Sequence, residues 1–146
     1  MSIFIIRGPQ ASGTRVRTAA PLPGAVLRSL VHRAIDAGRT VAIRSCSCED
    51  ELLTVLRVAD HTRGEITLLD PGCCAGSPRV QQRLRAMRNA WIEVHGETGA
   101  TVFPADCGRR IGLADGYLAQ TWVLALDMAL EHLGDAEACN PLRVGT

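Results

Sequence analysis

Two acid–base side chains stand two residues apart in the segment Ile92-Glu93-Val94-His95. Residues at this spacing lie on one face of a β-strand, so Glu93 and His95 are able to contact each other if the segment is extended. A carboxylate beside an imidazole orients the ring and favours its protonated form, which suits a general acid. A histidine at a strand end also commonly serves structure alone, and the pair by itself allows both interpretations.

A glycine-containing segment from Gly8 to Arg15 follows the first apolar run. It is similar to a Walker A loop, but every basic residue of the chain is arginine, and the lysine that reaches the phosphates is missing. A Ser/Gly/Thr loop in this place could instead hold the phosphate of a flavin mononucleotide, although Phe103 is the one aromatic residue that the expected edge loops offer to stack on the flavin. We therefore expect no cofactor.

Cysteine spacing argues against a structural zinc site. The six cysteines fall at positions 46, 48, 73, 74, 107 and 139, in C-x-C and C-C pairs and not in the C-x2-C pairs of such sites. We expect reduced thiols and no bound metal.

Length and composition fit one folded domain. The chain has 146 residues, of which 47% are apolar, and its net charge is +1 with no basic run, which argues against a disordered chain and against nucleic-acid binding. No apolar run approaches the ~20 residues of a membrane span. The N-terminal sequence lacks the features of a signal peptide, so we expect a cytoplasmic protein without membrane association.

Strand and helix patterns alternate along the chain. Short apolar runs predict strands at Ile3–Arg7, Thr40–Arg44, Glu65–Leu69, Ala90–Val94 and Arg110–Ala114. Helical spacing predicts helices at Gly24–Ala37, after a capping box at Ser47-x-x-Asp50, after Ser77-Pro78 with Val80, Leu84 and Met87 inside, and over Gly116–Leu133 with its end at Gly134. Val80, Met87 and Trp91 also suggest apolar surface beyond one core, which would favour an oligomer.

Five strands with helical crossovers predict a doubly wound α/β domain over residues 1–134, followed by a flexible tail over 135–146. In such sheets ligands bind outside the carboxyl ends of the strands. The loops at that edge are expected at Gly8–Pro23, Ser45–Cys48, Asp70–Ser77 and His95–Cys107.

These segments, in their order and spacing, resemble the type II 3-dehydroquinate dehydratases over Ile3 to about Leu133. Ile92–His95 is an unaltered match to the family's Ile-Glu-Val-His, and Gly116-Tyr117 matches the Gly-Tyr that opens its last helix. Gly8-Pro9-Gln10 stands where the family has Gly-Pro-Asn, and Asp70-Pro71-Gly72 where it has Asn-Pro-Gly. The resemblance implies a flavodoxin-like five-stranded parallel sheet of order 2-1-3-4-5 and a homo-oligomer, a trimer or a dodecamer.

The catalytic base of that family is replaced. Its lid tyrosine, activated by a lid arginine, removes the substrate proton. Arg15 stands in the place of the arginine, but the lid ends in Pro21-Leu22-Pro23-Gly24, and the single tyrosine, Tyr117, belongs to the last helix.

Three binding groups of the family are replaced as well. The asparagine that holds the enolate-stabilising water is Asp70, the substrate-binding histidine is Gly76, and the arginine-rich carboxylate-binding segment is Thr101–Asp106. Each lost contact costs about 10²-fold or more in rate, so the exchanges argue against 3-dehydroquinate dehydration and predict a roomier, less positive site.

The leading hypothesis is therefore a repurposed lyase or cyclase on this scaffold. It would eliminate, dehydrate or cyclise a carbonyl-containing small molecule, in specialised metabolite biosynthesis. His95 would be the general acid, oriented by Glu93, and Arg15 the oxyanion or carboxylate partner. Asp70 is the first candidate for the replacement base, and Cys74 or Glu97 the next. The expected substrate-binding residues are Gln10, Ser12, Cys73, Cys74, Gly76, Ser77, Glu97 and Asp106.

Two alternatives remain open from the sequence. Loss of several catalytic residues is also typical of a non-catalytic, dehydroquinase-like scaffold or small-molecule-binding pseudoenzyme. An active 3-dehydroquinate dehydratase with a substitute base is the third hypothesis.

Overall fold

The computed structural model describes residues 2–12, 14–61, 65–95, 103–104, 106–116 and 119–138, with the side chains of 12, 119 and 135–138 left aside. In this part of the chain the strands are β1 (Ser2–Arg7), β2 (Gln10–Ser12), β3 (Arg15–Arg17), β4 (Thr40–Ser45), β5 (Ile66–Asp70), β6 (Trp91–His95) and β7 (Arg110–Asp115). The helices are α1 (Gly24–Asp36), α2 (Glu49–Ala59), the short 3-10 turn η1 (Gly72–Cys74), α3 (Pro78–Arg85) and α4 (Ala119–Ala138). None of the helices found there is long and apolar enough to cross a membrane.

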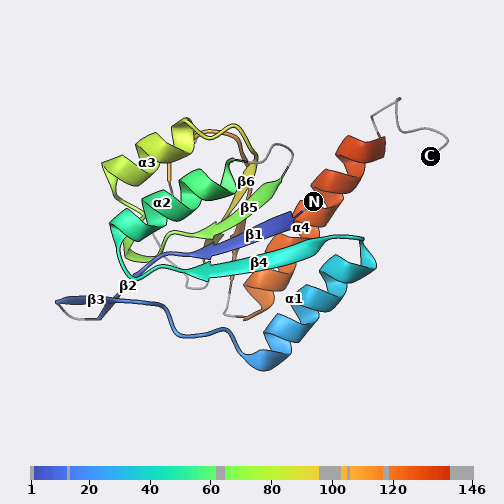
Figure 1. Cartoon of the computed structure of the whole chain (residues 1–146), viewed down its shortest axis with the longest axis horizontal. Helices are drawn as coiled ribbons and strands as arrows, with labels where there is room; N and C mark the ends of the chain where they lie inside the picture. Colours follow the sequence, from blue (N-terminus) through green and yellow to red (C-terminus); the bar gives the residue numbers. More distant parts are fainter. Residues whose placement is uncertain are drawn as a thin grey trace.

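The main sheet has five parallel strands in the order β4-β1-β5-β6-β7, with α1 and α4 on one face and α2 and α3 on the other (Figure 1). Counted along the main-sheet strands alone, this order is 2-1-3-4-5, so the predicted α/β doubly wound fold is confirmed. A separate antiparallel hairpin, β2–β3, follows β1.

Two helix boundaries differ from the predicted ones. α4 continues through Gly134 to Ala138, because Gly134 is not in the left-handed conformation that ends helices and its surroundings leave the helix room to continue. Ser47 does not cap α2: Cys48 is the N-cap, and the Ser47 hydroxyl donates to Glu51 Oε2 at 2.8 Å. The predicted cap of α3 is confirmed, since Ser77 Oγ accepts from Val80 N at 3.4 Å with Pro78 at the first helical position.

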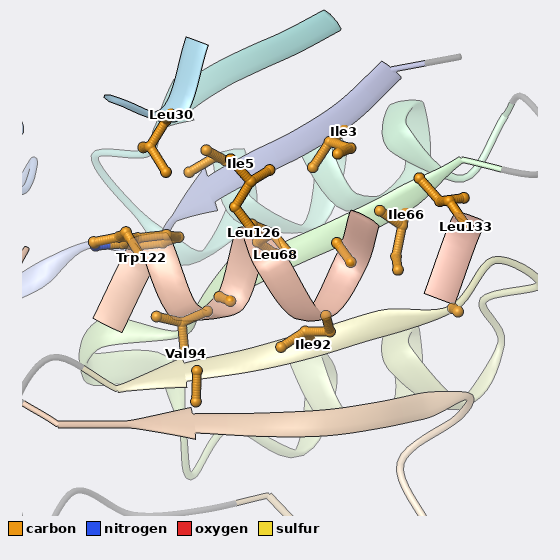
Figure 2. Packing of buried hydrophobic residues seen from close by; sticks show 14 of the residues in the cluster. Ile3, Ile5, Leu30, Ile66, Leu68, Ile92, Val94, Trp122, Leu126 and Leu133 are labelled. Carbon is orange, nitrogen blue, oxygen red and sulfur yellow. The ribbon is translucent and has the colours of Figure 1, made fainter. Parts of the chain in front are cut away.

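Each face of the sheet has its own apolar core. Figure 2 shows the core under α1 and α4, where Ile5, Ile92 and Trp122 are buried together. The second core lies under α2 and α3, and it includes Trp91 and Phe103. Since Ile92 faces the first core and Trp91 the second, the alternation along β6 places Glu93 and His95 on the side of α2 and α3.

Burial removes one argument for an oligomer. Val80, Met87 and Trp91, which suggested apolar surface beyond one core, are 0%, 4% and 0% exposed and belong to the core under α2 and α3. The expectation that they provide apolar surface is therefore wrong, because they pack in the core that α2 and α3 cover.

Two glycine-containing loops interlock at the carboxyl edge. Gly8 N donates to Asp70 O at 2.7 Å, and Cys73 N donates to Pro9 O at 2.8 Å. A Cβ on Gly8 would overlap the Pro71 carbonyl. A Cβ on Gly72, which has φ +57°, would overlap Pro9 O in the same way. This approach gives the Gly-Pro and Asp-Pro-Gly motifs a structural reason: only glycine fits where the two backbones meet.

Gly8→Ala is expected to lower the free energy of unfolding by about 2–3 kcal/mol, because the new methyl group overlaps backbone that has no freedom to retreat. The measurement is urea unfolding followed by circular dichroism. The matched control is Gly134→Ala, which adds the same atoms in open space inside α4 and should raise stability by about 0.5–1 kcal/mol. A Gly8→Ala protein as stable as the unsubstituted chain would contradict the interlock.

Candidate functional site

The candidate site lies where the central strands end. β1 is the second strand of the sheet, and its last residue, Arg7, is in register with Ser45 of β4 and Asp70 of β5. The connections from β1 to β4 and from β4 to β5 pass over opposite faces of the sheet, so β1 and β5 enclose the topological switch point (Figure 1). Ligands of doubly wound folds bind at this point.

Glu93 and His95 form the predicted pair. Glu93 is 0% exposed and His95 5%, and Nε2 of His95 is bonded to Oε2 of Glu93. The pair ends β6, two strands from Arg7. A buried carboxylate in this position fixes the plane of the imidazole. Because the bond uses Nε2, Nδ1 is the ring nitrogen that remains for another partner.

Arg110 completes the pair, although it was not among the residues predicted for the site. Arg110 Nη1 donates to Glu93 Oε1 at 2.7 Å and to Phe103 O at 2.9 Å, while Phe103 N donates to Glu93 Oε2 at 3.2 Å. The carboxylate thus receives three donors, and one arginine fixes both a strand and the loop residue Phe103. The contact depends on β7 lying beside β6 in register, which no local motif reveals.

Asp70 and Arg7 face each other across β1 and β5. Asp70 Oδ1 accepts from Gly72 N at 2.9 Å, so the carboxylate closes the turn, as aspartate before Pro-Gly commonly does. Arg7 was not among the predicted site residues. Burial lowers the pKa of its guanidinium, and the Asp70 charge partly offsets that effect.

The expected lid is a β-hairpin. β2 and β3 pair with Gln10 opposite Arg17 and with Ser12 opposite Arg15. β3 is exposed, and Figure 1 shows the hairpin extending away from the body of the sheet. No hydrogen bond or ion pair joins Arg15 to the Glu93–His95 pair among the described residues, and residues 10–12 and 15–17 pair as strands instead of opening a helix as a Walker A loop does.

Two of the thiols near this edge, Cys46 and Cys74, are buried. Burial is the main cause that raises the pKa of Cys46 to about 11 and of Cys74 to about 12, and neighbouring thiols add to it. Cys48 and Cys73 are exposed, and all of these thiols are free. A thiol with a pKa near 12 is almost wholly protonated at neutral pH, so Cys74 is a poor candidate for the base. Across the described ranges, no three His, Cys, Asp or Glu side chains are placed to hold a metal ion.

The remaining predicted residues have separate surroundings. Ser77 caps α3, the space around Gly76 is open, and exposed Asp106 accepts from Arg85 Nη2 at 3.4 Å. Glu97 lies outside the described residues, as does the side chain of Ser12.

Solved structures of other proteins share this fold. A type II dehydroquinase from Butyrivibrio crossotus superposes with a TM-score of 0.69 at 16% identity, over 90% of this chain and 97% of its own. A type II dehydroquinase from Propionibacterium acnes superposes with a TM-score of 0.67 at 16% identity, over 89% of this chain and 98% of its own. A 3-dehydroquinate dehydratase-like protein from Bifidobacterium longum superposes with a TM-score of 0.62 at 18% identity, over 92% of this chain and 98% of its own. No family model and no curated protein matches the sequence. At these identities the likeness establishes the fold.

Arg110→Met is expected to lower the free energy of unfolding by about 3 kcal/mol or more, because it leaves the Glu93 charge buried without a cationic partner. Adding Glu93→Gln should recover much of this loss, and urea unfolding of the four proteins of this cycle measures the coupling.

The exposed pair between Arg33 of α1 and Asp127 of α4, 2.9 Å apart, is the matched control. Arg33→Met should cost less than about 1 kcal/mol. Equal losses in Arg110→Met and Arg33→Met would show that the Glu93–Arg110 contact stabilises nothing beyond a surface pair.

Proposed function

We propose that this chain is a lyase- or cyclase-type enzyme that acts on a carbonyl-containing small molecule at the carboxyl edge of its sheet. The observation that carries the proposal is the buried Glu93–His95 pair, fixed by Arg110, at the end of β6. Doubly wound folds use this edge for chemistry, and the proteins of similar structure named above include dehydroquinases. The reaction is an elimination, dehydration or cyclisation, placed in specialised metabolism.

In the proposed elimination, His95 is the general acid. Its protonated ring donates to the departing hydroxyl group, so that the C–O bond breaks and water leaves. Asp70 accepts the proton from the carbon beside the carbonyl, and the electrons of that C–H bond form the new double bond. Arg15 is the proposed oxyanion or carboxylate partner from the hairpin, and Gln10, Cys73, Gly76 and Ser77 the nearest proposed substrate contacts.

A second candidate is a non-catalytic scaffold or small-molecule-binding protein of the same fold. One observation favours it: every partner of the Glu93 carboxylate belongs to the fold itself, as a purely structural cluster would require. The absence of a tyrosine between Gly8 and Gly24 points the same way. Activity of single-residue variants separates the two candidates.

His95→Ala and Arg15→Ala are each expected to lower turnover by about 10²-fold or more, and Asp70→Asn should abolish turnover while ligand binding persists. The assay incubates the protein with a panel of β-hydroxycarbonyl compounds in D₂O and follows exchange beside the carbonyl by NMR and loss of water by mass spectrometry. Circular dichroism confirms that each variant is folded.

3-Dehydroquinate belongs in this panel as a reference compound, and we expect no dehydroshikimate absorbance above background. Rapid dehydration of it would show that a substitute base supports the ancestral reaction. An Asp70→Asn protein with full activity, together with a His95→Ala protein that merely unfolds, would favour the scaffold.

The likeness to dehydroquinases also leads us to propose a homo-oligomer, a trimer or a dodecamer. Light scattering at micromolar concentration should therefore give a mass of at least three times 15.6 kDa. Exposed Ile111 and Leu113 on the edge strand β7 offer apolar surface for contacts between copies, and the pair Ile111→Thr and Leu113→Thr should weaken assembly. A stable monomer would contradict the proposal.

A further inference from the structure

Four of the chain's six cysteines lie at the carboxyl edge of the sheet. Cys46 directly follows β4, Cys48 is the N-cap of α2, and Cys73 and Cys74 belong to η1 after β5. Because β4 and β5 are parallel and lie on either side of β1, their carboxyl ends bring these cysteines to one edge of the sheet. All four thiols are free.

Cys73 and Cys74 form a pair within this group. They are adjacent in the chain, and a side-chain hydrogen bond joins their thiols. Cys73 is exposed, whereas Cys74 is only 6% exposed. Their backbone is fixed, since Cys73 N donates to Pro9 O at 2.8 Å and Cys74 N donates to Pro71 O at 3.0 Å. The interlock with the end of β1 therefore holds two neighbouring sulfur atoms in place.

The pair is poorly suited to a disulfide. The Cα atoms of adjacent residues are about 3.8 Å apart, whereas disulfides usually join Cα atoms that are roughly 4.4–6.8 Å apart. An S–S bond between Cys73 and Cys74 would therefore have to distort η1. A single ion bound by both sulfur atoms needs no such bond, so the geometry favours coordination over oxidation.

The number and type of ligands select the ion. Structural zinc sites use four ligands, and within the described part of the chain no third His, Cys, Asp or Glu is placed to complete a cluster. Burial first, and then the neighbouring Cys73 thiol and the Glu49 charge, raise the pKa of Cys74 to about 12. A cation must therefore displace a tightly held proton, which at neutral pH requires a strongly thiophilic ion. Cu(I) is such an ion, and two thiolates are sufficient to hold it.

We propose that Cys73 and Cys74 bind one Cu(I) ion at η1. Both thiols release their protons to solvent and each sulfur forms a bond to the ion, so that Cu⁺ and two thiolates carry one negative charge together. Exposed Cys73 gives the ion a path from solvent, and Cys74 anchors it beside the core under α2 and α3. The inference goes beyond the proposed function and does not depend on it. It departs from the expectation of no bound metal, which was based on the spacing of structural zinc sites.

The test titrates the fully reduced protein with Cu(I), without oxygen, in competition with the chromogenic chelator bathocuproine disulfonate. We expect one tightly bound Cu(I) per chain by native mass spectrometry and two sulfur neighbours by X-ray absorption. Cys73→Ser, which changes an exposed side chain, and Cys74→Ser should each lower the affinity by about 10²-fold or more. Cys73→Ser decides the test if circular dichroism shows that Cys74→Ser is not folded. The affinity should rise about tenfold or more for each pH unit between about 6 and 8, because Cys74 must release its proton.

Cys48→Ser is the matched control for an exposed thiol and Cys107→Ser for a buried one, and neither should change the affinity. Cys46→Ser and Cys139→Ser should also leave it unchanged, although Cys139 lies outside the described residues. Equal losses in all of the variants would show non-specific binding to thiols, and a loss in Cys46→Ser as large as that in Cys73→Ser would show a third sulfur ligand. Either result would overturn the proposal. Zn(II) binding as tight as Cu(I) binding, an affinity independent of pH, or an unchanged affinity in Cys73→Ser would overturn it as well.

Discussion

The site depends on one carboxylate that has no exposed surface. A buried Glu93 charge is costly unless it is paired and fully hydrogen-bonded, and three donors meet that requirement: the His95 ring, Arg110 Nη1 and Phe103 N. The three donors come from different segments: His95 from the same strand as Glu93, Arg110 from the neighbouring strand β7, and Phe103 from the loop before β7. The orientation of His95 is therefore set when the sheet forms, and no ligand is needed to establish it.

The interlocked turns after β1 and β5 impose the second constraint. Where Gly8 and Gly72 bring two backbones together, the amide groups bond to each other and are lost to ligands. A nucleotide-binding loop has the opposite arrangement, with glycines that leave amides open to phosphate. Similar glycine content thus has opposite consequences, and residues 10–12 and 15–17 of the Walker-like segment pair as the hairpin β2–β3 instead of opening a helix.

Sequence patterns predicted whatever depends on near neighbours along the chain. Short apolar runs located the five strands of the main sheet, the spacing of two located the Glu93–His95 contact, and Ser77-Pro78 located the start of α3. Arg110 and Arg7 were not predicted because their neighbours depend on strand order and register. Residue 110 is in register with residue 91, from where its side chain reaches Glu93, and residue 7 is in register with residue 70. The hairpin was not predicted because strands of three residues contain almost no periodicity to detect.

Charge balance links the two arginines to the proposed chemistry. Arg7 and Arg110 carry two positive charges, and Asp70 and Glu93 two negative ones, so these four groups are neutral together. Arg110 is engaged by Glu93, whereas the buried Nε of Arg7 has no hydrogen-bond partner among the described residues. Each of these arginines lies beside a carboxylate of a neighbouring strand, Arg110 bonded to Glu93 and Arg7 in register with Asp70. Strand order and register therefore set the charge balance at this edge of the sheet.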